Sequence, residues 1–143
     1  MADDEDDTIH DAFGIYHLRT RLPDGTLGLM PDTGAHDSLS GSMWVRDVAA
    51  AAAEAGHAST QQRCTKPRSV QGVGKGQQIC EYECTIPVGL QDTSGESYID
   101  DFSTPIVEDS GLPGLLGTIS LGRLDALMLV KTGKLRFLGA CGV

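Results

Sequence analysis

One short stretch constrains the fold of this chain more than any other. Residues 26–30 form an extended, mostly apolar run, and the tight turn Pro-Asp-Thr-Gly-Ala follows at residues 31–35. The turn carries a single carboxylate, that of Asp32, and small and polar residues lead away from it. If one residue of this chain performs chemistry, the pattern indicates Asp32.

The composition predicts one domain preceded by an acidic segment. The chain has 143 residues, 18 of them glycine, and only 5% aromatic residues, which indicates many turns and a core of Val, Leu, Ile and Ala. Six acids and no base fall within the first eleven residues, so the remaining residues carry a net charge of only -3. We predict a disordered acidic tail at residues 1–11 and a folded domain at residues 12–143. We interpret the tail as a solubilising or inter-domain segment rather than as a docking site.

Several functional classes are disfavoured by the sequence. No run approaches the roughly 18 apolar residues that a bilayer span needs, and no apolar signal segment follows Met1. No basic patch of the kind that nucleic acid requires is present. We therefore expect a protein without nucleic-acid or membrane partners. We expect it to be intracellular and cytoplasmic, or excised from a larger polyprotein.

Four cysteines raise the question of a disulfide or a metal site. Cys80 and Cys84 lie closest in sequence, in a run that reads as a strand. Four strand steps separate their Cα atoms by about 13 Å, whereas a disulfide needs roughly 4.4–6.8 Å. We therefore expect reduced, mostly buried thiols at Cys64, Cys80, Cys84 and Cys141, with no metal and no cofactor.

The hydrophobic pattern predicts an all-β fold with one or two helices. We expect strands at residues 12–20, 26–30, 79–90, 98–107, 126–130 and 135–138. We expect a helix at residues 43–55, with Ser42 as its N-cap and Gly56 as its stop, and a short helix at residues 118–124 capped by Thr118. Residues 57–68 read as polar and irregular. Leu22 to Gly25 reads as a turn.

Three motifs in order resemble the retroviral-type aspartic proteases, the retropepsin-like family. They are Asp-Thr-Gly-Ala at residues 32–35, the glycine-rich hairpin Gly-Val-Gly-Lys-Gly at residues 72–76, and Leu-Leu-Gly at residues 115–117. The closing strand, Lys-Thr-Gly-Lys turn and strand complete the likeness along residues 12–138. The helix at residues 43–55 is longer than in compact viral enzymes and is closer to retrotransposon or ubiquitin-shuttle protease domains.

The resemblance implies a closed β-barrel that forms half of an acid protease and is active as a homodimer. Peptide hydrolysis without a metal needs one group to activate water and another to protonate the carbonyl, and two close carboxylates that share one proton do both. Because the chain has one Asp-Thr-Gly, each subunit would contribute one Asp32. The implied function is an aspartic endopeptidase that cleaves a peptide or polyprotein.

The resemblance also assigns roles to individual residues. Thr33 would lock the two active-site loops together, Gly34 would admit the substrate backbone, and the glycine-rich hairpin would close over the substrate as a flap. The implied catalytic residues are Asp32, Thr33 and Gly34. The implied substrate-binding residues are Ala35, His36, Asp37, Gly72, Val73 and Gly74.

Three departures from the family pattern affect this expectation. Pro31 precedes Asp32 where the family usually has an aliphatic residue, and it removes an N–H from the strand. His36 and Thr118 replace an Asp and an Arg that often pair in viral enzymes, so that ion pair is absent. The acidic N-terminus suits a dimer sheet poorly, which leaves residues 135–143 as the better candidate.

Alternative functions remain open from the sequence. A protease-like module that has lost catalysis through a change such as Pro31 would serve dimerisation or peptide binding. A cysteine-based metal module is disfavoured because the cysteines lack a paired-ligand spacing. Ser38 and Ser40 lack a base and oxyanion arrangement, which disfavours a serine hydrolase.

Overall fold

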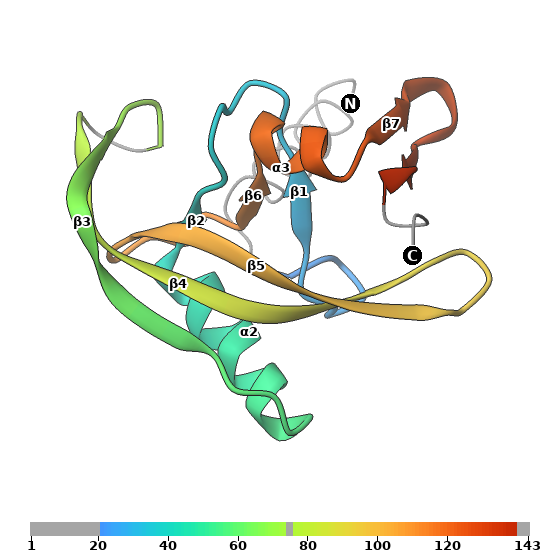
Figure 1. The fold of residues 1–143 in the computed structure, drawn as a ribbon, viewed down its shortest axis with the longest axis horizontal. Helices are drawn as coiled ribbons and strands as arrows, with labels where there is room; N and C mark the ends of the chain where they lie inside the picture. Colours follow the sequence, from blue (N-terminus) through green and yellow to red (C-terminus); the bar gives the residue numbers. More distant parts are fainter. Residues whose placement is uncertain (1–20, 74–75, 140–143) are drawn as a thin grey trace, which may run out of the picture.

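The computed structural model describes residues 21–73 and 76–139 and shows a mostly β-stranded fold with two α-helices in that part of the chain (Figure 1). The all-β prediction is therefore confirmed at this level. The predicted acidic tail, the predicted strand at residues 12–20, Gly74 and Cys141 lie outside the described residues.

The largest sheet has four strands in the order β2-β5-β4-β3. Its long members are β3 (Thr60–Val70), β4 (Gln78–Gln91) and β5 (Ser97–Val107), which pair antiparallel in succession. The short β2 (Ser40–Gly41) adds in parallel to the end of β5. Helix α2 (Ser42–Glu54) follows β2 directly and packs against this sheet (Figure 1).

Two smaller sheets complete the fold. Strand β1 (Leu29–Pro31) pairs in parallel with β6 (Gly114–Leu116), more than eighty residues away along the chain. Helix α3 (Thr118–Arg123) follows β6. The hairpin of β7 (Ala126–Leu129) and β8 (Lys134–Phe137) then closes the described chain, with the 3₁₀ turn η1 (Val130–Thr132) between its strands.

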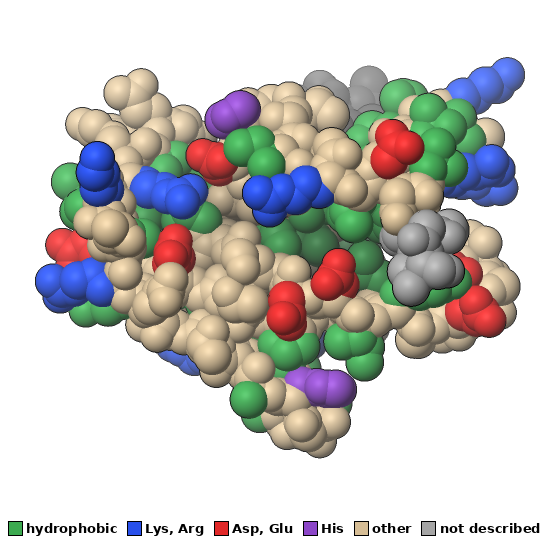
Figure 2. Space-filling model, viewed as in Figure 1, with side chains coloured by type: hydrophobic (Ala, Val, Ile, Leu, Met, Phe, Trp, Pro, Cys, Tyr) green, Lys and Arg blue, Asp and Glu red, His purple; other side chains and the backbone are tan. Residues whose placement is uncertain are grey.

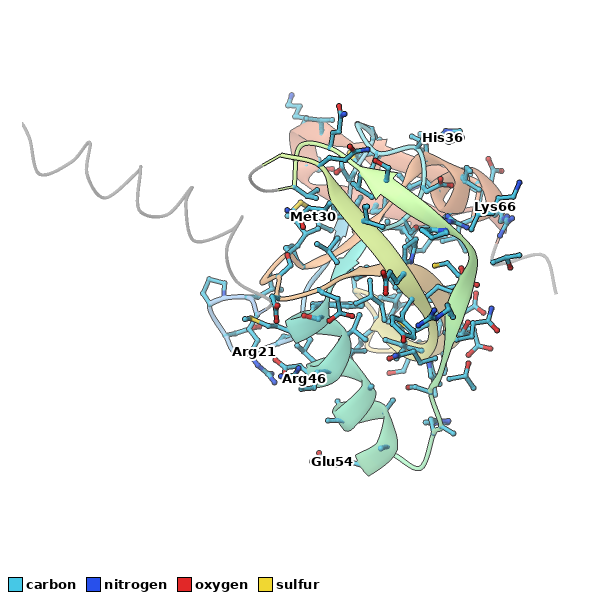
Figure 3. All side chains as sticks on the ribbon, turned by 90° about the vertical axis from the view of Figure 1, so that its left-hand side faces the viewer. Arg21, Met30, His36, Arg46, Glu54 and Lys66 are labelled. Atoms are coloured by element: carbon cyan, nitrogen blue, oxygen red, sulfur yellow. The ribbon has the colours of Figure 1, made fainter. Side chains whose placement is uncertain are left out.

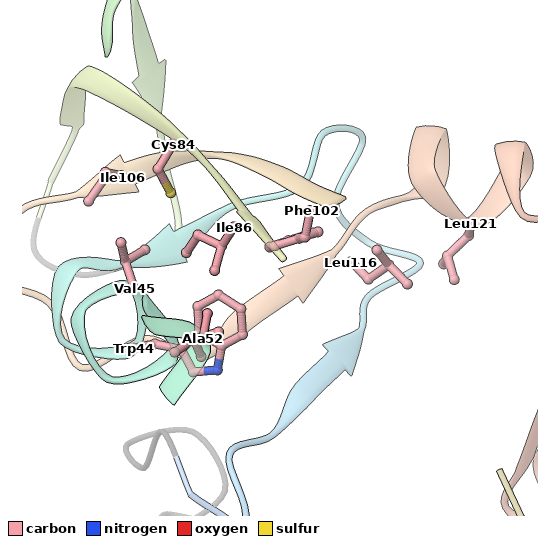
Figure 4. Packing of buried hydrophobic residues seen from close by; sticks show 10 residues of the cluster. Trp44, Val45, Ala52, Cys84, Ile86, Phe102, Ile106, Leu116 and Leu121 are labelled. Atoms are coloured by element: carbon pink, nitrogen blue, oxygen red, sulfur yellow. The ribbon is translucent and has the colours of Figure 1, made fainter. Parts of the chain in front are cut away.

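The main core lies between α2 and the large sheet (Figure 4). Trp44 is 1% exposed and meets Phe102 edge to face, with ring centroids 5.8 Å apart. Ile86 of β4 is completely buried beside them. Ala52 is the one fully buried alanine of α2, so Trp44, Val45 and Val48 supply most of the apolar area that this helix buries.

A second, smaller core cluster lies near the β1–β6 pair. Its buried members are Leu39, Cys80, Val107 and Leu115. Half-buried apolar residues from β1, β3 and the neighbouring loops pack against it, namely Met30, Val70, Val73 and Leu112. This cluster therefore joins β6, the β3–β4 hairpin and residues 32–39 between β1 and β2, which we call the Asp32 loop.

The prediction for residues 57–68 was wrong, because most of this segment belongs to β3. Strand β3 stands at the edge of its sheet, and Cys64 is its only fully buried side chain. An edge strand with both faces largely in water has no need for apolar alternation, so the periodicity signal was missing. A bulge between Arg63 and Arg68 interrupts its pairing with β4.

Two predicted helix caps were also wrong. Ser42 is the first residue of α2 and Gly41 occupies the N-cap position without a side-chain cap. Gly117 takes the same position for α3, which leaves Thr118 inside the helix. The predicted stop at Gly56 is confirmed, because Gly56 adopts a φ of +86° and its amide donates to the carbonyl of Ala53.

Candidate functional site

The Asp32 carboxylate is held by its own turn immediately after β1. The amide of Asp32 donates to the carbonyl of Leu116 at 2.9 Å, which continues the parallel pairing of β1 with β6. Its Oδ1 accepts a hydrogen bond of 2.9 Å from the amide of Gly34. This local hydrogen bond orients the carboxylate. Asp32 is half-buried, whereas Thr33 and Gly34 are exposed.

Strand β6 is hydrogen-bonded along both of its edges by the segments on either side of Asp32. On one edge it pairs in parallel with β1. On the other edge, the amide of Leu39 donates to the carbonyl of Leu115 at 3.1 Å, and the amide of Leu115 donates to the carbonyl of Leu39 at 2.7 Å. We call this two-sided pairing the clasp around β6, and through it the position of Asp32 depends on residues about eighty positions later in the chain.

The turn from β6 into α3 packs tightly against the backbone of the Asp32 loop. A Cβ on Gly117 would stand 2.5 Å from the backbone C and O of Asp37. The amide of Gly117 donates to the Ser38 hydroxyl at 3.2 Å, and that hydroxyl lies 2.9 Å from the hydroxyl of Ser120. Only glycine lacks the Cβ that would clash with this backbone. Steric contact therefore explains why the Leu-Leu-Gly motif ends in glycine.

Neutral hydrogen bonds tie Thr118 to the Asp32 loop. The Thr118 amide donates to the carbonyl of Ala35 at 2.8 Å, and its hydroxyl donates to the carbonyl of His36 at 3.2 Å. The amide of Ile119 also donates to the His36 carbonyl, at 3.1 Å. Positions 36 and 118 are thus in contact without an ion pair. His36 itself is exposed at the edge of the molecule (Figure 3).

Trp44 contacts the chain at the start of both strands of the β1–β6 pair. Its indole Nε1 donates to the carbonyl of Gly28 at 2.6 Å, just before β1. A Cβ on Gly114, the first residue of β6, would lie 2.6 Å from the indole ring. One buried side chain therefore holds the N-terminal ends of both β1 and β6 in place.

The β3–β4 hairpin reaches the same region from the large sheet. Gly72 and Gly76 both have positive φ, at +85° and +71°. Val73 is half-buried and packs against the second core cluster, with which Met30 also packs. The structure therefore brings Val73 to the cluster that contains both Leu39 and Leu115, although it places Gly72 at an exposed position.

An ion pair links β3 to the Asp32 loop. The Arg68 guanidinium lies 3.7 Å from the carboxylate of Asp37 and 3.9 Å from that of Glu83. The Arg68 and Asp37 side chains are each about half exposed, so water screens the pair and its stabilising effect is small. Nothing in the local sequence pattern around Arg68 predicted this contact.

A shallow hollow of about 220 Å³ opens beside Thr33. It lies between α3 and the β7–β8 hairpin, and its lining includes Thr118, Leu121, Met128 and Leu135. The hollow does not include Asp32. It therefore extends the surface around the exposed Thr33 rather than enclosing the carboxylate.

The three thiols within the described residues are buried rather than displayed at a site. Cys64, Cys80 and Cys84 are buried and free. Burial raises the pKa of the Cys84 thiol to about 11, with the charge of Glu83 as a second cause. Burial likewise raises the pKa of Cys80, with Cys64 contributing. Protonated thiols are poor nucleophiles.

No group of three or more His, Cys, Asp or Glu side chains in residues 21–73 and 76–139 is arranged to hold a metal ion. Within the same ranges, no helix has the length and apolarity to cross a membrane.

The structure brings several residues of the predicted site together. Asp32, Gly34, Ala35 and His36, which are neighbours in sequence, lie in one loop against α3, whereas the contact of Gly117 with this loop was not predicted. The supporting roles of Ser38, Ser120 and Trp44 were missed. Their hydrogen bonds join residues distant in sequence, so no local pattern could signal them.

Comparison with known proteins gave no relative: no protein-family model and no curated protein sequence matches this chain.

Proposed function

We propose that this chain is one half of a retropepsin-like aspartic endopeptidase, with two Asp32 carboxylates, one from each of two copies, activating a water molecule. The observation that supports it best is the clasp of the Asp32 loop around β6. That clasp holds one carboxylate in a fixed turn while leaving Thr33 and Gly34 exposed for a second copy.

The chemistry follows from the pairing of the two carboxylates. Close like charges cannot both ionise, so the pair would hold one proton between them. The ionised member accepts a proton from water as the water attacks the peptide carbonyl, and the protonated member donates to the carbonyl oxygen. The substrate would bind as an extended strand between the Asp32 loop and the β3–β4 hairpin, with Val73 at its wall.

The placement of Pro31 is compatible with this proposal. Pro31 pairs with Leu116 as the last residue of β1. Its missing N–H does not interrupt the attachment of the loop, because the next amide, that of Asp32, donates to Leu116. Proline keeps its carbonyl, which is the group that the Thr33 lock would use.

A peptide-cleavage assay from mildly acidic to neutral pH tests the proposal. We expect the wild-type chain to cleave a peptide library in a pepstatin-sensitive manner and Asp32→Asn to lose that cleavage. Asp101→Asn is the matched control, because Asp101 is an exposed carboxylate on β5 far along the chain from the loop. Equal turnover by wild type and Asp32→Asn would contradict the proposal.

The second candidate function is a catalytically inactive module that dimerises or binds peptides. The exposed apolar residues on and beyond the β7–β8 hairpin, including Leu127, Met128 and Leu138, favour a contact surface irrespective of catalysis. This candidate predicts self-association and peptide binding without cleavage, and no change of either on Asp32→Asn.

A further inference from the structure

The outer face of the β7–β8 hairpin combines positive charge with exposed apolar side chains. Ala126 and Phe137 pack against the main core, and Met128 and Leu135 line the hollow, so these four mark the inner face. Residues directly opposite in the ladder share a face. The pairs Leu127 with Arg136 and Leu129 with Lys134 therefore form the outer face.

The turn at the end of the hairpin extends this surface. Val130 is 84% exposed, and Lys131 beside it is exposed. Figure 2 shows Lys and Arg side chains beside a group of hydrophobic ones at this end of the molecule. We call the set Leu127, Leu129, Val130, Lys131, Lys134 and Arg136 the basic face.

The cations of the basic face have no ion-pair partner within the described residues. Those of β3 differ, because Arg68 lies beside Asp37 and Glu83, and Arg63 stacks on Tyr82 near Glu81. Residues 76–122 contain eight acids and no Lys or Arg. Within residues 21–73 and 76–139, the basic face is therefore a local group of cations without an ion-pair partner, in a chain of net charge -9.

We propose that the acidic segment at residues 1–11 of the same chain docks on the basic face. The segment carries six carboxylates and no base, and Ile9 and the following Phe13 offer apolar side chains for Leu127 and Val130. A two-fold contact of the basic face with its own copy would instead set Lys134 and Arg136 against like charges. Charge complementarity thus selects the segment over the copy.

The length of the connecting chain permits this contact. Ten residue steps separate Asp11 from Arg21, where the described chain begins. An extended chain of that length spans about 33 Å, whereas a domain of about 100 residues has a radius of gyration of only about 13 Å. From sequence alone the segment is interpreted as solubilising, and the uncompensated charge of the hairpin is the reason to assign it a site.

The docked segment would cover Arg136, which falls within residues 135–143, the candidate segment for the dimer sheet. The segment would then compete with dimerisation, a consequence that rests on the proposed function. The docking itself does not require catalysis.

Zero-length carbodiimide crosslinking of the full chain tests the docking, because it joins carboxylates to neighbouring lysine amines. The chain has four lysines, Lys66, Lys75, Lys131 and Lys134. In monomeric protein at about 0.05 M salt we expect crosslinks from residues 1–11 to Lys131 and Lys134, and their loss at about 1 M salt, where charges are screened within about 3 Å.

Two variants of equal charge change provide the control. Arg136→Glu should lower crosslinking to Lys131 and Lys134 about fivefold, since one exposed pair contributes up to about 1 kcal/mol. Arg46→Glu, on the exposed face of α2, should leave crosslinking unchanged. Crosslinks only within covalent dimers, equal crosslinking to Lys66 and Lys75, or no crosslinks at all would each overturn the proposal. The Asp32→Asn chain should give the wild-type crosslinks, which separates this test from that of catalysis.

Discussion

The Asp32 loop and the β3–β4 hairpin both carry predicted site residues, and both depend on glycine, but for different physical reasons. The Asp32 loop meets Gly117, at which a Cβ would stand 2.5 Å from the backbone of Asp37. The hairpin has Gly72, at which a Cβ would meet nothing within 4 Å although φ is +85°. Glycine provides close packing in the first region and a left-handed backbone in the second.

This difference indicates how the two regions respond to change. The Asp32 loop is fixed by long-range hydrogen bonds and backbone contact with β6 and α3, so small changes there should be costly. Among the described residues next to the hairpin turn, Val73 is half-buried, whereas Gly72 and Gly76 are exposed. The cost of substituting these two glycines should therefore be set by backbone conformation rather than by packing.

The largest effect is expected for Trp44→Ala, which removes the support beneath β1 and β6. Loss of a buried Trp costs about 3–5 kcal/mol of unfolding free energy, and the hydrogen bond to the Gly28 carbonyl is lost with it. Denaturant titration measures this. Met43→Ala, at the exposed neighbouring position of α2, should cost less than about 0.5 kcal/mol. Equal losses for both variants would mean that Trp44 has no special supporting role.

Gly117→Ala is expected to destabilise the protein by about 3 kcal/mol, because backbone atoms rather than a flexible side chain oppose the added methyl group. Gly122→Ala in the same helix should have the opposite sign. Nothing lies within 4 Å of that Cβ, and alanine favours a helix by about 0.5–1 kcal/mol over glycine. Thermal unfolding measures both effects. A shift of the melting temperature in the same direction for the two variants would show that close packing does not require glycine at position 117.

Gly72→Ala should lower the free energy of unfolding by about 1 kcal/mol, because alanine must adopt the left-handed backbone conformation of Gly72 but meets no steric clash. Gly89→Ala on β4 is the matched control, with the same open space but without positive φ, and it should be neutral or slightly stabilising. Chemical denaturation distinguishes these outcomes. A loss at Gly72 as large as that at Gly117 would remove the distinction between the two regions.

The smallest effect is expected for Arg68→Ala, which breaks the only ion pair we find between the β3 side of the hairpin and the Asp32 loop in the described residues. Exposed pairs contribute about 0–1 kcal/mol. The loss should shrink further at about 1 M salt, at which the Debye length is about 3 Å. A loss above about 2 kcal/mol, unaffected by salt, would show that Arg68 packs rather than pairs.

The sequence predicted local features better than distant ones. The turn at Gly25, the stop at Gly56 and the pairing of β7 with β8 follow from residues close together in the chain, and the structure has all three. Strand β3 was missed because an exposed edge strand lacks periodicity. The clasp around β6 and the hydrogen bond of the Ser38 hydroxyl join residues about eighty positions apart. Local sequence patterns therefore could not predict these contacts.

A subunit-mixing experiment tests the central claim, that Asp32 is half of a shared site, most directly. Wild-type chain is mixed with a threefold excess of Asp32→Asn under conditions that allow subunit exchange, and cleavage per wild-type chain is measured. A shared two-fold site predicts a fall to about one quarter, because mixed dimers hold only one carboxylate. A threefold excess of Asp101→Asn should leave cleavage per chain that carries Asp32 unchanged. Unchanged cleavage in the presence of excess Asp32→Asn would contradict a site shared between two chains.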